Sequence, residues 1–166
     1  MPAPRDCPCH SKKRYAACCG PLHKGDATAE TAAALMRSRY AAFSLGLGEY
    51  LLTTLAHSHP DRTADAAELG SSRRHQRFMD LCILQEVGEA AADQAQVLFY
   101  ARLFERGIDY SFVELSDFVR EDGAWRYQKG TLVPAAEVPG DPRQLTRAAF
   151  DALAIEHAFV PHVASD

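Results

Sequence analysis

The stretch IDYSFVELSDFVREDGAWRYQK, residues 108–129, decides the fold class of this chain. Its first half alternates with the period of two that is typical of a β-strand. One face would carry Tyr110, Phe112, Glu114, Ser116 and Phe118, and the other Val113, Leu115 and Val119. Asp122-Gly123 is a residue pair that favours a tight hairpin turn, and residues 124–129 then return as a second strand. The stretch therefore predicts an antiparallel hairpin.

Helices are expected before and after the strands along the chain. The first would run from the N-cap Thr28 to Gly46, and shorter ones would follow at residues 49–55 and 61–69. The first helix has one apolar stripe, made by Met36, Tyr40, Phe43 and Leu47. After an extended segment that contains prolines, residues 145–159 are expected to form a terminal helix.

Two more strands are expected before the hairpin, at residues 78–87 and 96–104. One face of the second would carry Val97, Phe99, Ala101 and Leu103. Helices followed by antiparallel strands with short turns form an α+β pattern. We expect a strongly curved, cone-shaped sheet wrapped around the first helix, because this arrangement buries the apolar residues of both.

Length and charge narrow the possible functions. The chain has 166 residues, which suits one domain with a small appendage, and its net charge of −4 argues against strong nucleic-acid binding by the body. No apolar run is long enough to span a membrane, and the first residues do not form a secretory signal. We therefore expect a cytoplasmic protein in a reducing compartment.

Four of the five cysteines lie close together, at Cys7, Cys9, Cys18 and Cys19. A reducing compartment disfavours disulfides, and the Cys-x-x-Cys spacing of redox motifs is absent. Zinc, which prefers four soft ligands in a tetrahedron, is the favoured interpretation. Reduced thiols without metal in a flexible arm are the alternative. Residues 1–25 carry a net charge of +4, which would favour thiolates.

The pattern C-P-C-x-S-x-x-x-Y-x-x-C-C-G over residues 7–20 resembles the SEC-C motif, the zinc-binding element of the SecA translocation motor. The resemblance implies one zinc ion, held by Cys7, Cys9, Cys18 and Cys19. By analogy it implies a docking role toward a chaperone, translocation or ribosomal partner for the basic loop Lys12, Lys13 and Arg14. His10 stands where the motif usually has glycine, so it should need positive φ or strain the turn. His10 and His23 are alternative ligands.

The body resembles the YchJ family of small bacterial proteins. The resemblance rests on LMRSRYAAF (residues 35–43), Tyr50-Leu51-Leu52, Glu114-x-Ser116-x-Phe118 and Asp122-Gly123-x-Trp125-x-Tyr127-x-x-Gly130-Thr131. It implies a nuclear transport factor 2-like, or cystatin-like, cone domain after a SEC-C motif, and no defined molecular function. The predicted division is a zinc knuckle at residues 1–25, the cone domain at 26–132, and an extended segment with a helix at 133–166. A second, C-terminal SEC-C motif is absent, which is consistent with one zinc.

The first helix and the hairpin supply the candidate site. Glu114 lies on a strand face that should be buried, so it needs a partner, and Arg37 or Arg39 would provide one. Ser116 and Tyr40 would lie nearby. The pair could be a structural link between helix and sheet, or Glu114 could be an acid in the mouth of the cone.

Two functions follow. The first is a zinc-binding adaptor or small-ligand-binding protein, and the alternative is a small enzyme of hydrolase or isomerase type with Glu114 as its acid or base. An open pocket with a desolvated acid that is not paired with arginine favours the enzyme. A pocket filled by Trp125, Phe112 and Phe118 favours the adaptor.

Overall fold

The computed structural model describes residues 5–88 and 91–160. Its α-helices are α1 Gly20–Lys24, α2 Ala32–Leu45, α3 Gly48–Thr53, α4 Ala66–Ser71 and α5 Arg147–His157. Its strands are β1 Arg77–Val87, β2 Gln94–Glu105, β3 Ile108–Asp109, β4 Phe112–Glu121 and β5 Ala124–Pro134. Short 3-10 helices cover Tyr15–Ala17, Pro60–Thr63, Ala135–Glu137 and Pro142–Gln144. No helix in this described part of the chain has the length and apolarity needed to cross a bilayer.

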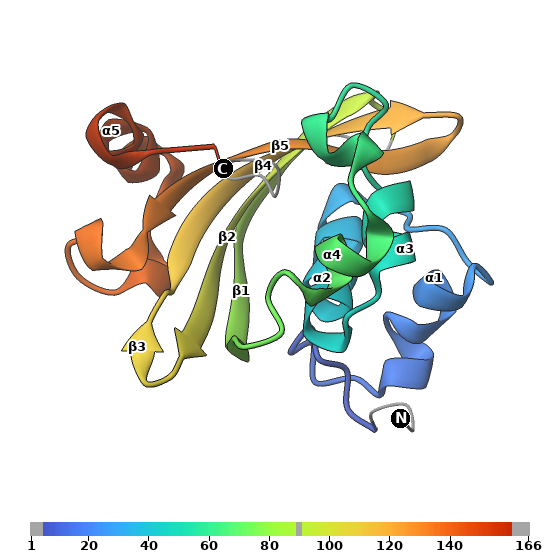
Figure 1. The fold of residues 1–166 in the computed structure, drawn as a ribbon. Coiled ribbons are helices and arrows are strands. Elements are labelled where there is room, and N and C mark those ends of the chain that lie inside the picture. Colours follow the sequence, from blue (N-terminus) through green and yellow to red (C-terminus); the bar gives the residue numbers. More distant parts are fainter. Residues whose placement is uncertain (1–4, 89–90, 161–166) are drawn as a thin grey trace.

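The strands form one antiparallel sheet in the order β1-β2-β4-β5, with the short β3 paired to the end of β2. The β4–β5 hairpin turns at Asp122 and Gly123, whose φ angles are 53° and 77°. Figure 1 shows the helices α2, α3 and α4 on one side of the curved sheet and α5 on the other. The predicted α+β fold with a curved antiparallel sheet on N-terminal helices is confirmed.

The two faces of the sheet bury separate cores. Toward α2, the core contains Val97, Phe99, Ala101, Leu103, Phe118 and Trp125. On the opposite face, Leu98, Val113 and Val133 pack with Phe150, which is the buried residue of α5. The alternation predicted for β2 is therefore confirmed, and a helix covers each side.

Several predicted boundaries are wrong for local reasons. The N-cap of α2 is Thr31, whose hydroxyl accepts a hydrogen bond from the amide of Ala34 at 3.1 Å, so the helix starts after the predicted Thr28. The expected strand over residues 108–120 is interrupted. The Asp109 carboxylate accepts a hydrogen bond from the Ser111 amide at 2.8 Å, which turns the chain between β3 and β4.

The region between α3 and β1 also differs from the prediction. Residues 61–69 do not form one helix, because Pro60–Thr63 is a 3-10 turn and Asp65 caps a new helix, α4. Helix α4 continues to Ser71, beyond the expected end of the helix at residue 69. The three-part division of the chain stays a prediction, and residues 1–4 and 161–166 of its outer parts lie outside the described residues.

Candidate functional site

The four N-terminal cysteine sulfurs lie together. All of their Sγ atoms are within 4.8 Å of one another, and the Cys9–Cys18 and Cys18–Cys19 distances are 3.6 Å and 3.9 Å. A regular tetrahedron with metal–sulfur bonds of about 2.3 Å separates its sulfurs by about 3.8 Å. Cys7, Cys9 and Cys19 are buried and Cys18 is half-buried. The cluster therefore fits a tetrahedral metal ion.

The thiols of this cluster influence one another strongly. Hydrogen bonds with Cys19 and Cys7 lower the pKa of Cys9, whereas hydrogen bonds with Cys7 and Cys9 raise the pKa of Cys19. One thiolate forms readily, and its charge opposes a second one. A divalent cation removes this opposition because it offsets the thiolate charges. The donor set of four sulfurs is the kind that soft cations prefer.

Both histidines of the knuckle bind backbone carbonyls and lie outside the cysteine cluster. His10 has a φ of 61°, as expected for a residue that replaces glycine, and its Nε2–H donates to the Phe78 carbonyl at 3.1 Å. The His23 Nε2–H donates to the Ser38 carbonyl at 2.8 Å, and the Tyr15 hydroxyl donates to its Nδ1 at 2.6 Å. These bonds tie the knuckle to β1 and α2.

The basic loop lies at the surface of the knuckle. The side chains of Lys12, Lys13 and Arg14 are exposed. The loop backbone is fixed, because the Cys7 amide donates to the Lys13 carbonyl at 2.9 Å and the Lys13 amide donates to the Ser11 hydroxyl at 3.3 Å. The docking role of this loop stays a prediction.

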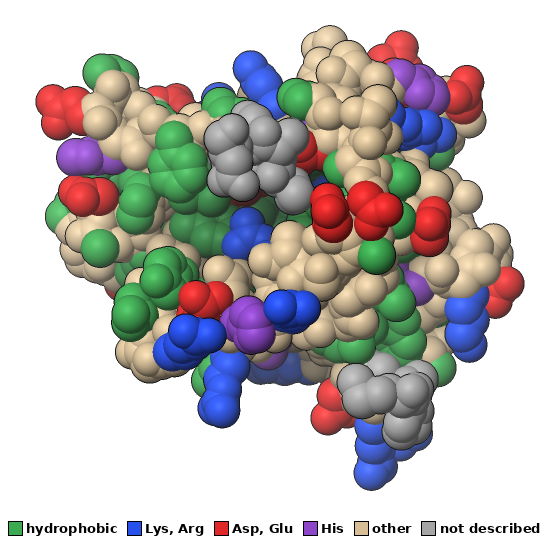
Figure 2. Space-filling view, in the orientation of Figure 1, with side chains coloured by type: hydrophobic (Ala, Val, Ile, Leu, Met, Phe, Trp, Pro, Cys, Tyr) green, Lys and Arg blue, Asp and Glu red, His purple; other side chains and the backbone are tan. Residues whose placement is uncertain are grey.

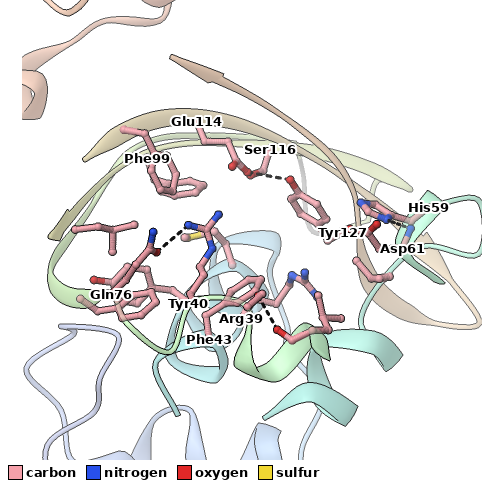
Figure 3. Close-up of a pocket in the computed structure, with 18 of the residues that line it drawn as sticks. Arg39, Tyr40, Phe43, His59, Asp61, Gln76, Phe99, Glu114, Ser116 and Tyr127 are labelled. Atoms are coloured by element: carbon pink, nitrogen blue, oxygen red, sulfur yellow. Dashed lines mark hydrogen bonds between the residues drawn. The ribbon is translucent and has the colours of Figure 1, made fainter. Parts of the chain in front are cut away.

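A cavity of about 390 Å³ lies between the helices and the concave face of the sheet. Its aromatic lining consists of Phe43, Phe78, Phe99, Phe112 and Phe118. Its polar lining includes Arg39, Tyr40, Arg73, Gln76, Glu114 and Tyr127. In Figure 2 this face of the molecule is hollowed, with hydrophobic and basic side chains inside the hollow. Figure 3 shows Glu114 and Ser116 extending from the sheet toward the helix residues Arg39 and Phe43.

Glu114 is buried in the wall of this cavity, with 6% of its surface exposed. One of its carboxylate oxygens, Oε2, accepts hydrogen bonds from the hydroxyls of Ser116 and Tyr127, the latter at 3.1 Å. Burial raises the pKa of Glu114, although these bonds and the nearby arginines lower it in part. A Cβ at Gly130 would collide with this oxygen and with the Tyr127 hydroxyl. Glycine at position 130 therefore allows this group to form.

The arginines of α2 point in different directions, and in the described part of the chain neither forms an ion pair with Glu114. Arg37 faces the knuckle and donates to the Cys9 carbonyl at 3.0 Å. Arg39 lines the cavity and donates to the Leu51 carbonyl at 2.7 Å and to the Thr54 hydroxyl at 2.6 Å. The expected ion pair with Glu114 is therefore wrong for Arg37. Arg39 lies in the same cavity as Glu114 but does not contact it directly.

Two further residues of the cavity differ in whether their position could be predicted from the sequence. Tyr40 lines the cavity as predicted, and its hydroxyl donates to the Asp80 carbonyl at 3.0 Å. Arg73 was not predicted, because it lies in a turn after α4, where no periodicity assigns a face. Its guanidinium lies over the rings of Phe43 and Phe112, at 5.4 Å and 5.8 Å from their centroids.

Comparison with known proteins identifies the family. A family model described as the middle, NTF2-like domain of YchJ matches residues 31–130. The chain belongs to the YchJ family. It is 40% identical over 140 residues to a UPF0225 protein of Vibrio vulnificus, covering 82% of this chain and 80% of that protein. It is 36% identical over 127 residues to the UPF0225 protein YchJ of Shigella dysenteriae, covering 75% and 82%.

Two solved structures of SEC-C motif proteins are similar to this YchJ-family chain. A solution structure from Rhodopseudomonas palustris gives a TM-score of 0.67 at 32% identity, covering 75% of this chain and 96% of that one. A crystal structure from Psychrobacter arcticus gives 0.65 at 25% identity, covering 75% and 80%. Both the SEC-C and the YchJ resemblance of the sequence are thus confirmed.

We predict that Glu114→Gln changes how stability depends on pH. Because the pKa of Glu114 is raised in the folded state, the folded protein holds this proton at pH values where the unfolded chain has lost it. Wild-type stability should therefore fall relative to the variant as pH rises above about 4.3, and the difference should level off above the folded-state pKa. Urea denaturation at a series of pH values measures this difference.

The control for this experiment is Glu49→Gln, which removes an exposed carboxylate at the start of α3. Acid loss of any bound metal affects all three proteins equally, so it cancels in the difference. Parallel stability curves for the wild type and Glu114→Gln would contradict the prediction.

A second prediction concerns the positive φ of His10. Both His10→Ala and His10→Gly remove the bond to Phe78, but only alanine keeps a Cβ in the left-handed conformation. We expect the alanine variant to be less stable than the glycine variant by about 1 kcal/mol, measured by urea denaturation of the metal-loaded proteins. Ala16→Gly, in the 3-10 helix Tyr15–Ala17, should be destabilising instead. A glycine variant no more stable than the alanine variant would refute the strain at position 10.

Proposed function

We propose that this protein binds a small molecule in the cavity beneath the curved sheet and carries one structural zinc ion in its N-terminal knuckle. The observation that carries the ligand-binding proposal is the cavity itself, whose volume of about 390 Å³ is in the range of small-molecule pockets. It combines an aromatic wall with a few convergent polar groups, which is the usual composition of such a pocket.

The aromatic residues that could have filled this space support the proposal. Phe112 and Phe118 form part of the wall and leave the cavity open. The Trp125 ring contacts the guanidinium of Arg120, at 4.4 Å from the ring centroid, and is not part of the lining. A pocket filled by these residues would have favoured an adaptor. The open cavity favours a protein that takes up a small molecule, and with a buried Glu114 that contacts no arginine of the described chain it also meets the condition stated above for an enzyme.

The cysteine cluster supports zinc as a structural ion. Its four sulfurs match the spacing of a closed tetrahedral site, which has no free coordination position for a substrate. When bound, the ion would have Cys7, Cys9, Cys18 and Cys19 as its ligands. It would hold the two cysteine pairs of the knuckle together. In the described chain the four cysteines of the cluster form no disulfide, so all four sulfurs are available as ligands.

A second candidate function is an enzyme that transfers a proton in this cavity. The observation in its favour is Glu114, a buried acid with a raised pKa and no direct arginine partner. A compound that binds the cavity and is converted by the wild type but not by Glu114→Gln would favour this candidate. A bound compound that is released unchanged would favour the binding protein.

We predict that protein purified without added metal contains about one zinc per chain. Cys9→Ser and Cys19→Ser should lose the metal, because each removes one of four soft ligands. Cys82→Ser is the matched control, since Cys82 is a thiol on β1 outside the cluster. Elemental analysis by mass spectrometry gives the ratio. Iron, an absence of metal, or equal loss in the Cys82 variant would disprove the site.

For the cavity, we predict that small aromatic probes such as benzyl alcohol and benzamide bind, detected by saturation-transfer NMR. Ser72→Trp should abolish binding because Ser72 is an exposed residue of the cavity lining, where a large ring would block access. Ser71→Trp is the control, since Ser71 is also exposed and is not part of the lining. If a range of such probes fails to bind the wild type, or binds equally to the Ser72 variant, the cavity is not the binding site.

A further inference from the structure

Two arginines line the cavity, and their hydrogen bonds go to uncharged acceptors. Arg39 has only 7% of its surface exposed, and it donates to a carbonyl and a hydroxyl. Arg73 donates to the side-chain oxygen of Gln76 at 3.0 Å, a bond drawn in Figure 3. A charge removed from water is costly unless an opposite charge compensates it. Two guanidinium groups in one cavity therefore leave a place for an anion.

The acidic residues of the lining compensate these charges only in part. Glu114 and Asp61 both interact with Arg39 through space, and Glu114 also interacts with Arg73. Within the described chain, neither acid forms an ion pair with either arginine. The lining acids match the two arginines in number, but in the described chain the hydrogen bond of Arg73 goes to the uncharged Gln76 and not to a carboxylate. Arg73 is therefore available to a carboxylate supplied by a ligand.

The surroundings of Arg73 suit a flat carboxylic acid. Its guanidinium lies over the rings of Phe43 and Phe112. Its hydrogen bond to Gln76 uses Nη1, which leaves Nε and Nη2 for further hydrogen bonds. The fork of a guanidinium matches a carboxylate with two parallel hydrogen bonds. Phe99 packs against Phe112 in an edge-to-face arrangement, with the ring centroids 6.0 Å apart, and supplies an apolar wall for the rest of a ligand.

We propose that the cavity ligand is a small carboxylic acid with an apolar, ring-sized body, and that Arg73 binds its carboxylate. This inference rests on the proposed ligand-binding function and specifies its ligand class. Arg39 contributes positive charge from the helix side, while its hydrogen bonds to Leu51 and Thr54 hold α2 against α3. The aromatic wall receives the apolar body.

The experiment compares benzoate with benzamide, two probes of nearly the same shape that differ in charge. Wild-type protein should bind benzoate at least about tenfold more tightly, as charge-assisted hydrogen bonds to a carboxylate require. Arg73→Gln should remove most of this preference while leaving benzamide binding in place, because Arg39 contributes charge but no direct bond to the carboxylate. Arg74→Gln, which removes the same charge from an exposed neighbour, should keep the preference. NMR titration gives the affinities.

The outcomes separate this inference from the proposed function. Equal affinity of the wild type for the two probes overturns the proposal that the ligand is a carboxylic acid. This comparison uses the wild-type protein alone, so it does not depend on whether a variant folds. A preference for benzoate that is undiminished in Arg73→Gln overturns the role of Arg73. If uncharged probes bind but carboxylates do not, the inference fails and the binding function stands. If no probe binds, the binding function itself fails.

Discussion

The structure depends on the enclosure of helix α2, in which Ser44 is the one exposed residue. Its face toward the sheet contributes Leu35, Met36 and Tyr40 to one core, while Ala41 packs against the cysteine cluster and Ala42 against α3 and α4. A helix buried all round cannot have a single polar face. Its polar residues must therefore each find a specific partner, and this requirement places Arg37, Ser38 and Arg39 in three different environments.

This enclosure also joins the knuckle to the cavity. The His10 ring packs edge-to-face against Tyr40, with centroids 5.8 Å apart, and Tyr40 packs in the same way against Phe78 at 5.2 Å. Tyr40 and Phe78 both line the cavity. His10, next to the buried Cys9, is thus one aromatic contact away from the cavity lining. A metal bound in the knuckle would hold His10, and through it this end of the cavity, in one position.

Sequence periodicity predicted which residues of β2 and β4 face α2, but it did not predict which side chains meet in the cavity. The alternation along β2 and β4 identifies which residues face α2, because each residue's face follows from its position in the strand. The contact between Glu114 and Tyr127 depends on the pairing of β4 with β5, which is irregular after Asp117, and no pattern in one strand contains it. Arg73 lies in a turn, and its guanidinium is flanked by rings from α2 and β4, so no local pattern indicates its direction. The grouping of the four cysteines was predictable because their sequence pattern resembles the SEC-C motif.

The two arginines of the cavity differ in what the fold requires of them. No other side chain simply replaces Arg39. Its guanidinium donates hydrogen bonds to the Leu51 carbonyl, near the C-terminal end of α3, and to the Thr54 hydroxyl beyond it. Its presence is therefore explained by structure alone. In the described part of the chain, Arg73 donates a hydrogen bond to Gln76 alone, three residues further on. An apolar residue would pack between the same rings at lower desolvation cost. A charge that the fold does not need, held at a cavity between aromatic faces, is best explained by what the cavity binds.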